Sequence, residues 1–225
     1  MPISIAIDGP SGAGKSTIAK LVAERIGAMY LDTGAMYRAI GLYMTRAGVP
    51  LDDFSAIEAA LPQVPLRVKH ENGVQATYLG EENVSEAIRT PEISAAASAV
   101  SKVPAVREAM VSLQRSIAAG LDIVMDGRDI ATKVLPNAEV KVFLTATSEV
   151  RAERRYKELD GLQSYEEVLA DILLRDHNDT TRAASPLQKA EGAVEIDSSS
   201  LDVETCAGRI IALAEQARKT RNERK

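Results

Sequence analysis

The sequence predicts an α/β fold in which a parallel sheet carries helices on both faces. Apolar runs of strand length alternate with segments of helical periodicity along most of the 225 residues, and such alternation is typical of parallel sheets. Residues 62–100 interrupt the alternation with a hairpin pattern. We therefore expect a small antiparallel sheet inserted into the parallel one.

The first predicted strand and helix enclose a complete phosphate-binding motif. Residues 2–7 form a continuous, largely β-branched run, as in a buried parallel strand. Residues 9–16 then read GPSGAGKS, which matches G-x-x-x-x-G-K-[ST], and residues 16–26 have helical spacing before Gly27, a C-cap residue. Strand, loop and helix follow in the order that this motif requires, which argues against a chance glycine-rich turn. The fold predicted is that of a P-loop NTPase.

The residue types of the motif explain its chemistry. Glycines let consecutive backbone N–H groups point at phosphate oxygens, and the helix N-terminus adds a favourable dipole. Lys15 is expected to reach the β- and γ-phosphates of a nucleoside triphosphate, and the Ser16 hydroxyl to bind Mg²⁺. The residues predicted to bind this triphosphate are Gly9, Pro10, Ser11, Gly12, Ala13, Gly14, Lys15, Ser16 and Thr17.

The remaining elements follow from periodicity and from helix and turn signals. Further strands are predicted at 29–31, 121–126, 140–144 and 193–196. Helices are predicted at 34–45, 53–61, 91–102, 104–119, 148–159, 164–180 and 202–219, with a frayed charged end over 219–225. The inserted hairpin pairs 64–69 with 74–79 around Glu71-Asn72-Gly73, since Asn-Gly is a strong hairpin signal. Asp8, Asp32 and Asp126 lie at predicted strand ends, where ligands bind in such sheets.

Composition restricts the class of protein. Hydrophobic residues make up 45% and charged residues 26% of the chain, as in an ordinary globular protein. The net charge of −5 argues against a broad nucleic-acid-binding surface. One cysteine, Cys206, precludes an intrachain disulfide, and we expect a small buried or half-buried side chain there. No apolar run approaches a membrane span of about 18 residues, and the first strand leaves no room for a signal peptide, so we expect a cytoplasmic protein.

Arginines mark the second substrate. Arg38 lies in LDTGAMYR and Arg128 in DGRD, each directly after a predicted strand. Two further groups share a helix face by spacing: Arg151, Arg154 and Arg155, and Arg175, Asp179 and Arg182. A solvated helix face with salt bridges to Glu149, Glu153 or Asp176 is the alternative for each group. Beside a P-loop, the arginines together indicate clamps on two phosphorylated substrates.

The motifs GPSGAGKS, LDTGAMYR, DGRD, RAERR and RDHNDTTR, taken together, resemble those of bacterial cytidylate kinases, P-loop enzymes that phosphorylate CMP and dCMP. The resemblance covers essentially the whole chain. It implies one P-loop kinase domain over 1–225, with a core of about 1–33, 103–147 and 183–225. It also implies a nucleoside-monophosphate-binding region with the insertion at about 34–102 and a lid at about 148–182.

The resemblance also implies roles for residues. Catalysis would rest on Lys15, Arg128, Arg151, Arg154 and Arg155, the last three in the lid. CMP would be bound by Thr33, Arg38, Ser98, Arg107, Arg128, Asp129, Arg175, Asp179 and Arg182. Ser16 would bind Mg²⁺, with Asp126 acting through water, although a hydrogen bond within the loop is an equally good role for Asp126. The substrates would be ATP and CMP or dCMP, with no nucleic-acid or membrane partner, and the protein would be a monomer.

The chemistry of the base agrees with these roles. Asp129 can accept from the exocyclic amino group of cytosine and Arg107 can donate to its acceptors, whereas uracil reverses both polarities. The phosphate nucleophile is already ionised at pH 7, so neither His70 nor His177 is needed as a general base. Rival hypotheses are a kinase for UMP, AMP or a non-nucleotide acceptor, and a P-loop ATPase. A GTP-dependent switch would need an N-K-x-D motif, which the sequence lacks.

Overall fold

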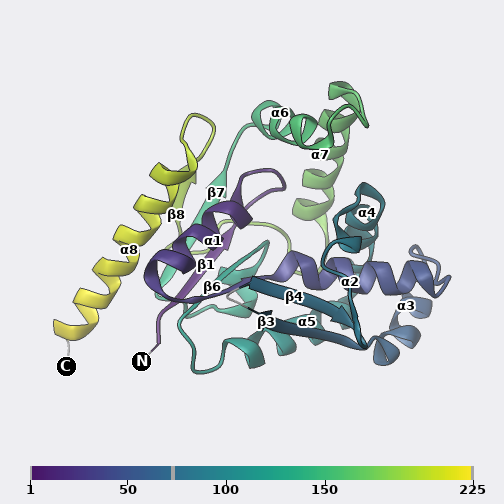
Figure 1. Cartoon of the computed structure of the whole chain (residues 1–225), viewed down its shortest axis with the longest axis horizontal. Coiled ribbons are helices and arrows are strands. Elements are labelled where there is room, and N and C mark those ends of the chain that lie inside the picture. The colour runs from purple at the N-terminus through teal and green to yellow at the C-terminus, as the bar shows by residue number, and fades with distance from the viewer. Residues whose placement is uncertain (1, 72–73, 224–225) are drawn as a thin grey trace. The chain divides into compact units, whose positions relative to one another are not determined.

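The computed structural model describes residues 2–71 and 74–223 and divides the chain into two compact units (Figure 1). The first unit comprises Met1–Tyr30 and Gly120–Lys225, and the second comprises Leu31–Ala119. The first unit contains the five-stranded sheet and the second unit contains the three-stranded sheet, and each unit has helices of its own.

The first unit is built on a five-stranded sheet of order β2-β6-β1-β7-β8. Its strands are β1 (Ser4–Asp8), β2 (Met29–Asp32, which begins in this unit), β6 (Ile123–Gly127), β7 (Val140–Thr145) and β8 (Val194–Asp197). β1 pairs in parallel with β6 and β7, and β7 with β8. Because Ile7 lies opposite Asp126, the carboxyl-terminal edge of the sheet carries both Asp8 and Asp126.

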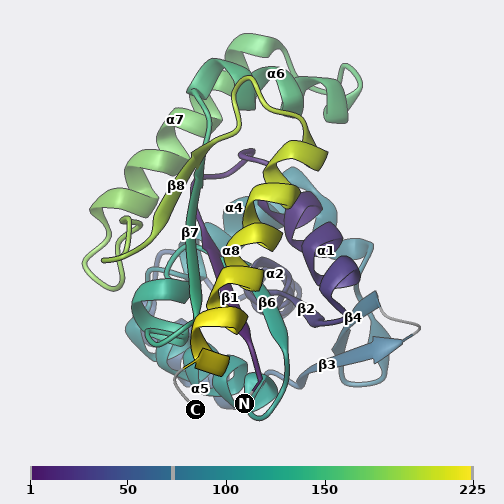
Figure 2. The ribbon, with the colours of Figure 1, turned by 90° about the vertical axis from the view of Figure 1, so that its left-hand side faces the viewer.

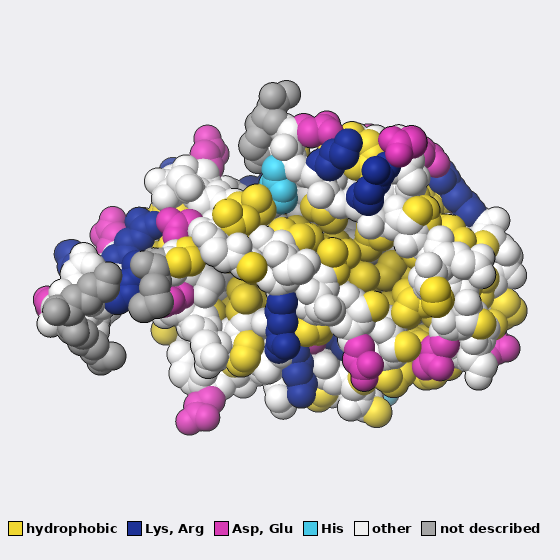
Figure 3. All heavy atoms as spheres, turned by 90° about the horizontal axis from the view of Figure 1, so that it is seen from below, with side chains coloured by type: hydrophobic (Ala, Val, Ile, Leu, Met, Phe, Trp, Pro, Cys, Tyr) yellow, Lys and Arg dark blue, Asp and Glu magenta, His cyan; other side chains and the backbone are white. Residues whose placement is uncertain are grey.

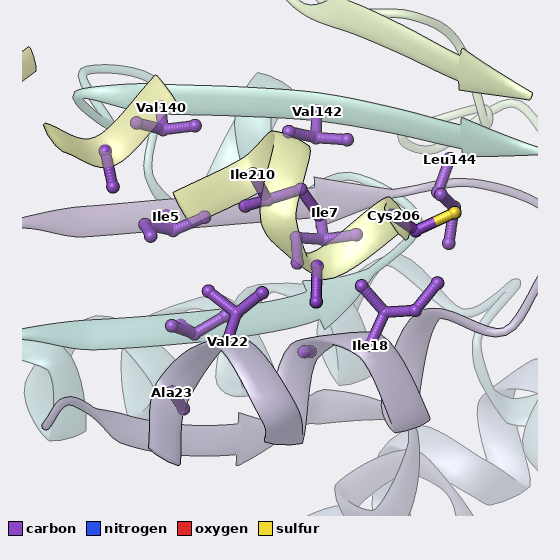
Figure 4. Close-up of a cluster of buried hydrophobic side chains, with 14 of the residues drawn as sticks. Ile5, Ile7, Ile18, Val22, Ala23, Val140, Val142, Leu144, Cys206 and Ile210 are labelled. Atoms are coloured by element: carbon purple, nitrogen blue, oxygen red, sulfur yellow. The ribbon is translucent and has the colours of Figure 1, made fainter. Parts of the chain in front are cut away.

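Two helices cover one face of this sheet. The helices of the unit are α1 (Lys15–Ile26), α6 (Ser148–Leu159), α7 (Tyr165–Thr181) and α8 (Val203–Glu223), with a short π-helical turn η3 (Ile130–Val134) after β6. α1 and α8 lie side by side against the strands (Figure 2). Their apolar side chains, such as Val22 and Ile210, meet Ile7 of β1 and Val142 of β7 in one buried cluster (Figure 4). Cys206 is fully buried there, as predicted.

The helix ends follow local signals with one exception. Gly27 ends α1 in the left-handed conformation, and Ser164 and Glu167 form the predicted capping box of α7. The expectation of a frayed end from residue 219 is wrong for the described part, because α8 continues to Glu223. Arg218 pairs with Asp122, and Arg221 donates to the Pro2 carbonyl. These contacts hold the last turns against the sheet; residues 224–225 lie outside the described residues.

The second unit combines helices with a small antiparallel sheet. Its elements are α2 (Thr33–Arg46), α3 (Phe54–Ala60), η1 (Leu61–Gln63), β3 (Leu66–Glu71), β4 (Val74–Leu79), β5 (Glu82–Asn83), η2 (Ala87–Arg89), α4 (Pro91–Val100) and α5 (Pro104–Ala118). The α2 helix packs closely on α4, where Gly41 approaches the backbone of Ala96 and Ala97. Ala39, Leu79 and Ile88 belong to the buried cluster under the small sheet.

The predicted hairpin is present. β3 and β4 pair antiparallel: Glu71 lies opposite Val74 at one end of the pairing, and Leu66 lies opposite Leu79 at the other. Along β3, half-buried residues alternate with exposed ones. The Asn72-Gly73 turn lies outside the described residues. The short strand β5 extends the hairpin to three strands, which the sequence pattern did not indicate. The predicted fold class is confirmed: a mostly parallel sheet with helices and a small antiparallel sheet.

Candidate active site

The phosphate-binding loop joins β1 to α1, and its first residue must be glycine. Gly9 has φ +152°, and a Cβ there would lie 1.9 Å from the Leu144 carbonyl oxygen of β7. No side chain fits in that space, because the neighbouring atom is backbone. The loop therefore passes directly against the sheet, and α1 begins at Lys15 with Gly14 as its N-cap. A helix N-terminus in this position is a ready site for a phosphate group.

Lys15 is buried and its ammonium is bound within the loop. Its Nζ donates to the Pro10 carbonyl over 2.6 Å. Burial, followed by repulsion from the Arg128 guanidinium, holds the pKa of Lys15 well below its usual value. A phosphate in the loop would supply the opposing charge that favours the ammonium form. The side chain is thus suited to neutralising a bound polyphosphate.

Ser16 and Asp126 form the oxygen pair expected of a magnesium site. The Ser16 hydroxyl donates to Asp126 Oδ2 over 3.0 Å, and the Tyr30 hydroxyl donates to Oδ1 over 2.7 Å. Among the described residues, no cluster of three or more His, Cys, Asp or Glu side chains is arranged to hold a metal. Mg²⁺ commonly binds through one or two protein oxygens, waters and substrate phosphates, so hard oxygen donors at this place fit it.

Arg151 and Arg154 of α6 are linked to the phosphate-binding loop, Arg151 directly and Arg154 through Ser198. Arg151 donates to the Ser11 carbonyl over 3.1 Å and to the Ala146 carbonyl over 2.9 Å. Arg154 donates to the Ser198 carbonyl over 2.6 Å, and the Ser198 hydroxyl donates to the Ala13 carbonyl over 3.0 Å. These bonds engage two loop carbonyls.

Arg155, predicted with Arg151 and Arg154, makes a different contact. Its guanidinium pairs with Glu158 of the same helix, at an Nη1–Oε2 distance of 3.0 Å, and the Arg155 side chain is one-third exposed. Arg151 therefore contacts the loop and Arg154 contacts Ser198, which binds the loop. Arg155 forms a salt bridge within α6.

A second charged group joins the DGRD loop to α7. Arg128 Nε donates to Asp179 Oδ2 over 2.8 Å, and Arg182 Nη1 lies 3.6 Å from Asp179 Oδ1. Burial by itself would raise the pKa of Asp179, but Arg128 and Arg175 hold it below the usual value. Arg182 lies just past the end of α7, not on its face as the spacing predicted, and Nε donates to the Ser185 carbonyl over 2.7 Å.

In the second unit, Asp32 organises the start of α2. It caps the helix by accepting from the Ala35 N–H over 2.8 Å, and it accepts from Arg38 Nη2 over 2.9 Å. Gln75 of β4 binds both the N–H and the carbonyl of Asp32, at 2.7 and 3.2 Å. Thr33 follows as the first residue of the helix and is buried. The carboxylate thereby holds the Arg38 guanidinium in a defined place.

Arg107 of α5 lies over an aromatic ring. Its Cζ is 5.6 Å from the centre of the Tyr37 ring, and its Nη1 donates to the Ser101 carbonyl over 3.1 Å. Ser98 lies on α4, and its carbonyl accepts from the Ser101 hydroxyl over 2.8 Å. Arg107 and Ser98 are predicted from the sequence, whereas Tyr37 and Ser101 are not. Tyr37 precedes Arg38 within LDTGAMYR, so the motif itself offered a signal for it.

The predicted residues thus form groups within each unit. In the first, Ser16 meets Asp126, Arg151 and Arg154 meet the loop, and Arg128 and Arg182 meet Asp179. In the second, Arg38 is fixed by Asp32, and Arg107 by Tyr37 and Ser101.

The parallel sheet, the glycine loop leading into α1, and the lysine and serine at the start of that helix define a P-loop nucleotide-binding fold. The crystal structure of shikimate kinase from Bacteroides thetaiotaomicron superposes with a TM-score of 0.51 at 14% identity, covering 95% of this chain and 98% of that chain. An uncharacterised protein from Eubacterium ventriosum gives 0.54 at 14% identity, covering 96% and 99%. At these identities the likeness concerns the fold alone.

The chain belongs to the cytidylate kinase family, whose sequence profile matches residues 5–216. A cytidylate kinase from Caldicellulosiruptor bescii is 48% identical over 94% of this chain and 95% of its own length. A cytidylate kinase from Listeria monocytogenes is 46% identical over 95% and 96%. The protein is thus a member of a family of nucleoside monophosphate kinases.

The face of the molecule in Figure 3 carries charges of both signs. On the face in Figure 3, the lysine and arginine side chains of the described residues are scattered among aspartate and glutamate, without one continuous basic area. In the parts of the chain that the structure describes, no helix has the length and apolar character needed to cross a membrane.

Proposed function

We propose that this protein transfers the γ-phosphoryl group of ATP to CMP or dCMP with Mg²⁺, giving ADP and CDP or dCDP. The observation that carries the proposal is the match to a relative named cytidylate kinase at 48% identity over 94% of the chain. The phosphate-binding loop, with Lys15 and Ser16 at the start of α1, also supports it, because these residues have the chemistry needed to bind a polyphosphate.

ATP is bound by the loop from Gly9 to Thr17. Lys15 neutralises the β- and γ-phosphates, for which its buried ammonium is suited. Ser16 holds Mg²⁺ together with the phosphates, and Asp126 accepts from the Ser16 hydroxyl or acts through a bound water. When bound, Mg²⁺ supplies charge neutralisation on the phosphate oxygens.

CMP is bound through its phosphate, its sugar and its base. Arg38 and Arg128 hold the acceptor phosphate; each is already anchored by one carboxylate, Asp32 or Asp179. Arg175 and Asp179 bind the sugar, with Thr33 and Arg182 close by. Fixing an arginine before the substrate arrives lowers the entropy lost on binding. Anchored guanidiniums are therefore well suited to aligning a phosphate.

The base is selected by Asp129, Arg107 and Ser98. Asp129 accepts from the cytosine amino group, and Arg107 donates to the ring acceptors. Uracil would bring a carbonyl against the carboxylate and an N–H against the guanidinium. Because buried polar groups left unpaired are costly, we expect discrimination against UMP of at least about a hundredfold.

Catalysis is alignment and neutralisation of charge. The acceptor phosphate carries about −1.5 to −2 charges at pH 7, so no side chain has to remove a proton from it. Lys15, Arg128 and the arginines of α6 stabilise charge on the transferred group. Residues 148–182 act as a lid that excludes water, residues 34–102 bind the acceptor, and the remaining core binds ATP.

The test is ADP formation from ATP and Mg²⁺ with CMP, dCMP, UMP, AMP and GMP offered separately. Fast turnover with CMP and dCMP alone supports both the kinase and the base recognition. Equal use of UMP would retain the kinase and refute the roles of Asp129 and Arg107. Turnover that needs no acceptor would indicate an ATPase instead. Light scattering during the assay checks the expectation of a monomer.

A further inference from the structure

Asp8 is a buried carboxylate to which the proposed mechanism gives no role. It is the last residue of β1 and is 2% exposed. Its Oδ1 accepts from the Ile130 N–H and its Oδ2 from the Ala131 N–H, both over 2.8 Å. Both oxygens are thus bound to backbone groups more than a hundred residues away in the chain.

These two N–H groups begin the turn that follows the DGRD loop. Arg128 and Asp129 directly precede Ile130, the first residue of η3. The other side of the turn is closed by the Asp129 carbonyl, which accepts from the Lys133 N–H over 2.8 Å. Asp8 supplies two acceptors to N–H groups at the start of the turn, where a helical turn leaves its donors unsatisfied. The carboxylate therefore fixes the backbone directly after Asp129.

An ionised group at this place has an energetic cost. Burial and the Asp129 carboxylate act against the charge, while the two N–H bonds and Lys15 favour it. Bonds from N–H groups to a carboxylate are stronger than neutral ones, and here each of the two N–H groups binds its own oxygen. In the same place an asparagine would offer one acceptor oxygen and turn its NH₂ group towards the second N–H. The observed geometry therefore fits a carboxylate and not an amide.

Asp8 also directly precedes Gly9, the first residue of the phosphate-binding loop. Its backbone is held in the sheet between Gly127 of β6 and Phe143 of β7. Its side chain holds the turn after Asp129. One residue therefore connects the loop proposed to bind ATP with the loop proposed to bind CMP.

We propose that Asp8 is a positioning residue for the acceptor nucleotide: by holding Ile130 and Ala131, it sets the places of Arg128 and Asp129. The inference rests on the proposed function and deepens it. Asp8 does not touch the substrate; it acts through the two residues that precede the turn.

The test is Asp8→Asn, measured with both substrates. The backbone of residue 8 stays in the sheet, so the KM for ATP changes by less than about twofold. One lost charge-assisted bond is enough for a rise of about tenfold in the KM for CMP. The preference for CMP over UMP also falls, because Asp129 is no longer held in place. A merely structural role would change neither the KM for CMP alone nor the base preference.

Asp122→Asn is the matched control. Asp122 lies at the other end of the same sheet, and its Oδ1 accepts from the Ile3 N–H over 2.6 Å. The change is again from a carboxylate that binds a backbone N–H to an amide. We expect lower stability with an unchanged KM for CMP. An equal rise in the KM for CMP in both variants would overturn the proposal.

Amide hydrogen exchange gives a measurement independent of activity. In the unmodified protein, Ile130 and Ala131 exchange slowly, and in Asp8→Asn both exchange faster while β8 does not. If Asp8→Asn does not fold, Asp8→Glu, which keeps the charge and displaces it, is used for the same measurements. Fast exchange of both amides in the unmodified protein would overturn the proposal whichever variant folds.

The experiment distinguishes failure of the proposed function from failure of the positioning role of Asp8. If the unmodified protein does not use CMP, the proposed function fails. If it uses CMP and Asp8→Asn has the same KM for CMP and the same base preference, only the positioning role fails.

Discussion

Arg151 of α6 and Asp176 of α7 form a bidentate ion pair, with an Nη1–Oδ1 distance of 3.0 Å and an Nη2–Oδ2 distance of 2.6 Å. The same guanidinium donates to the carbonyl of Ser11 in the phosphate-binding loop. Because paired N–H donors fix the plane of the guanidinium, Asp176 determines how Arg151 meets the loop. A residue of α7 thus acts on the phosphate-binding loop through one arginine.

Replacing Asp176 with asparagine should weaken this connection. Arg151 is 4% exposed, so the loss of its carboxylate partner is expected to cost about 2 kcal/mol of unfolding free energy. The KM for ATP should rise more than the KM for CMP. Urea unfolding and initial rates check both effects. Glu153→Gln is the control, since Glu153 pairs with Lys157 on an exposed face of α6 and should matter little. Equal losses of unfolding free energy and equal rises of the KM for ATP in the two variants would refute the prediction.

Replacing Lys15 with methionine should abolish phosphoryl transfer and preserve the fold. Methionine retains the length and removes the charge that neutralises the phosphates, so we expect turnover to fall by at least about a thousandfold. Since burial disfavours the ammonium, the melting temperature should be unchanged or higher. Lys20→Met, on the exposed side of α1, should retain activity. Near-normal turnover of a folded Lys15→Met protein would contradict the mechanism.

The ring of Tyr37 should matter to CMP through Arg107. Leucine at position 37 removes the stacking surface, and the KM for CMP should rise about threefold to tenfold. Phenylalanine keeps the ring and should behave like tyrosine. Initial rates with CMP varied at saturating ATP measure the effect. A rise of the same size in Tyr37→Phe would assign the effect to the hydroxyl group and not to the ring.

Two helical glycines should respond to alanine in opposite directions. A Cβ on Gly41 of α2 would lie 2.9 Å from the Ala97 backbone nitrogen of α4, so Gly41→Ala should cost about 1–3 kcal/mol. Gly208 of α8 has nothing within 4 Å of such a Cβ. Gly208→Ala should therefore stabilise the protein by up to about 1 kcal/mol through helix propensity. Thermal unfolding of both variants decides. A loss of stability in Gly208→Ala would contradict the prediction.

Asp8 should make stability depend on pH. Burial, the largest effect, raises the pKa of Asp8 from 3.8 to about 6 in the folded protein. The folded state then keeps a proton that the unfolded chain releases, so this stabilisation is full below about pH 3.8 and is lost as the pH rises through about 6. As the pH rises across that window, the free energy of unfolding of the unmodified protein should fall by roughly 3 kcal/mol relative to that of Asp8→Asn. Urea unfolding from pH 4 to 7.5 measures it, and a constant difference would contradict the shift.

Much of the fold follows from local signals, and the loop is the clearest case. The strand, the glycines and the helix start are adjacent in the sequence, and β1, Gly14 and α1 appear as predicted. The contacts of the site are different, because they are long-range. Tyr30 and Asp126 are 96 residues apart, and Ser11 and Arg151 are 140 apart. No periodicity or short motif relates such pairs, so Tyr30 was not among the predicted residues.

By itself the sequence determined most strands and helices and their order along the chain, the phosphate-binding loop and the arginines that could meet phosphates, although it did not indicate β5. These depend on interactions between neighbours along the chain, such as capping, turn preference and helical spacing. The tertiary structure decided which carboxylate binds each polar or charged side chain: Asp126 for Ser16, Asp179 for Arg128 and Asp176 for Arg151. It also decided that Asp8 binds the turn after Asp129. A buried charge needs a partner, and the folding of strands and helices onto one another brings residues that are far apart in the sequence into contact.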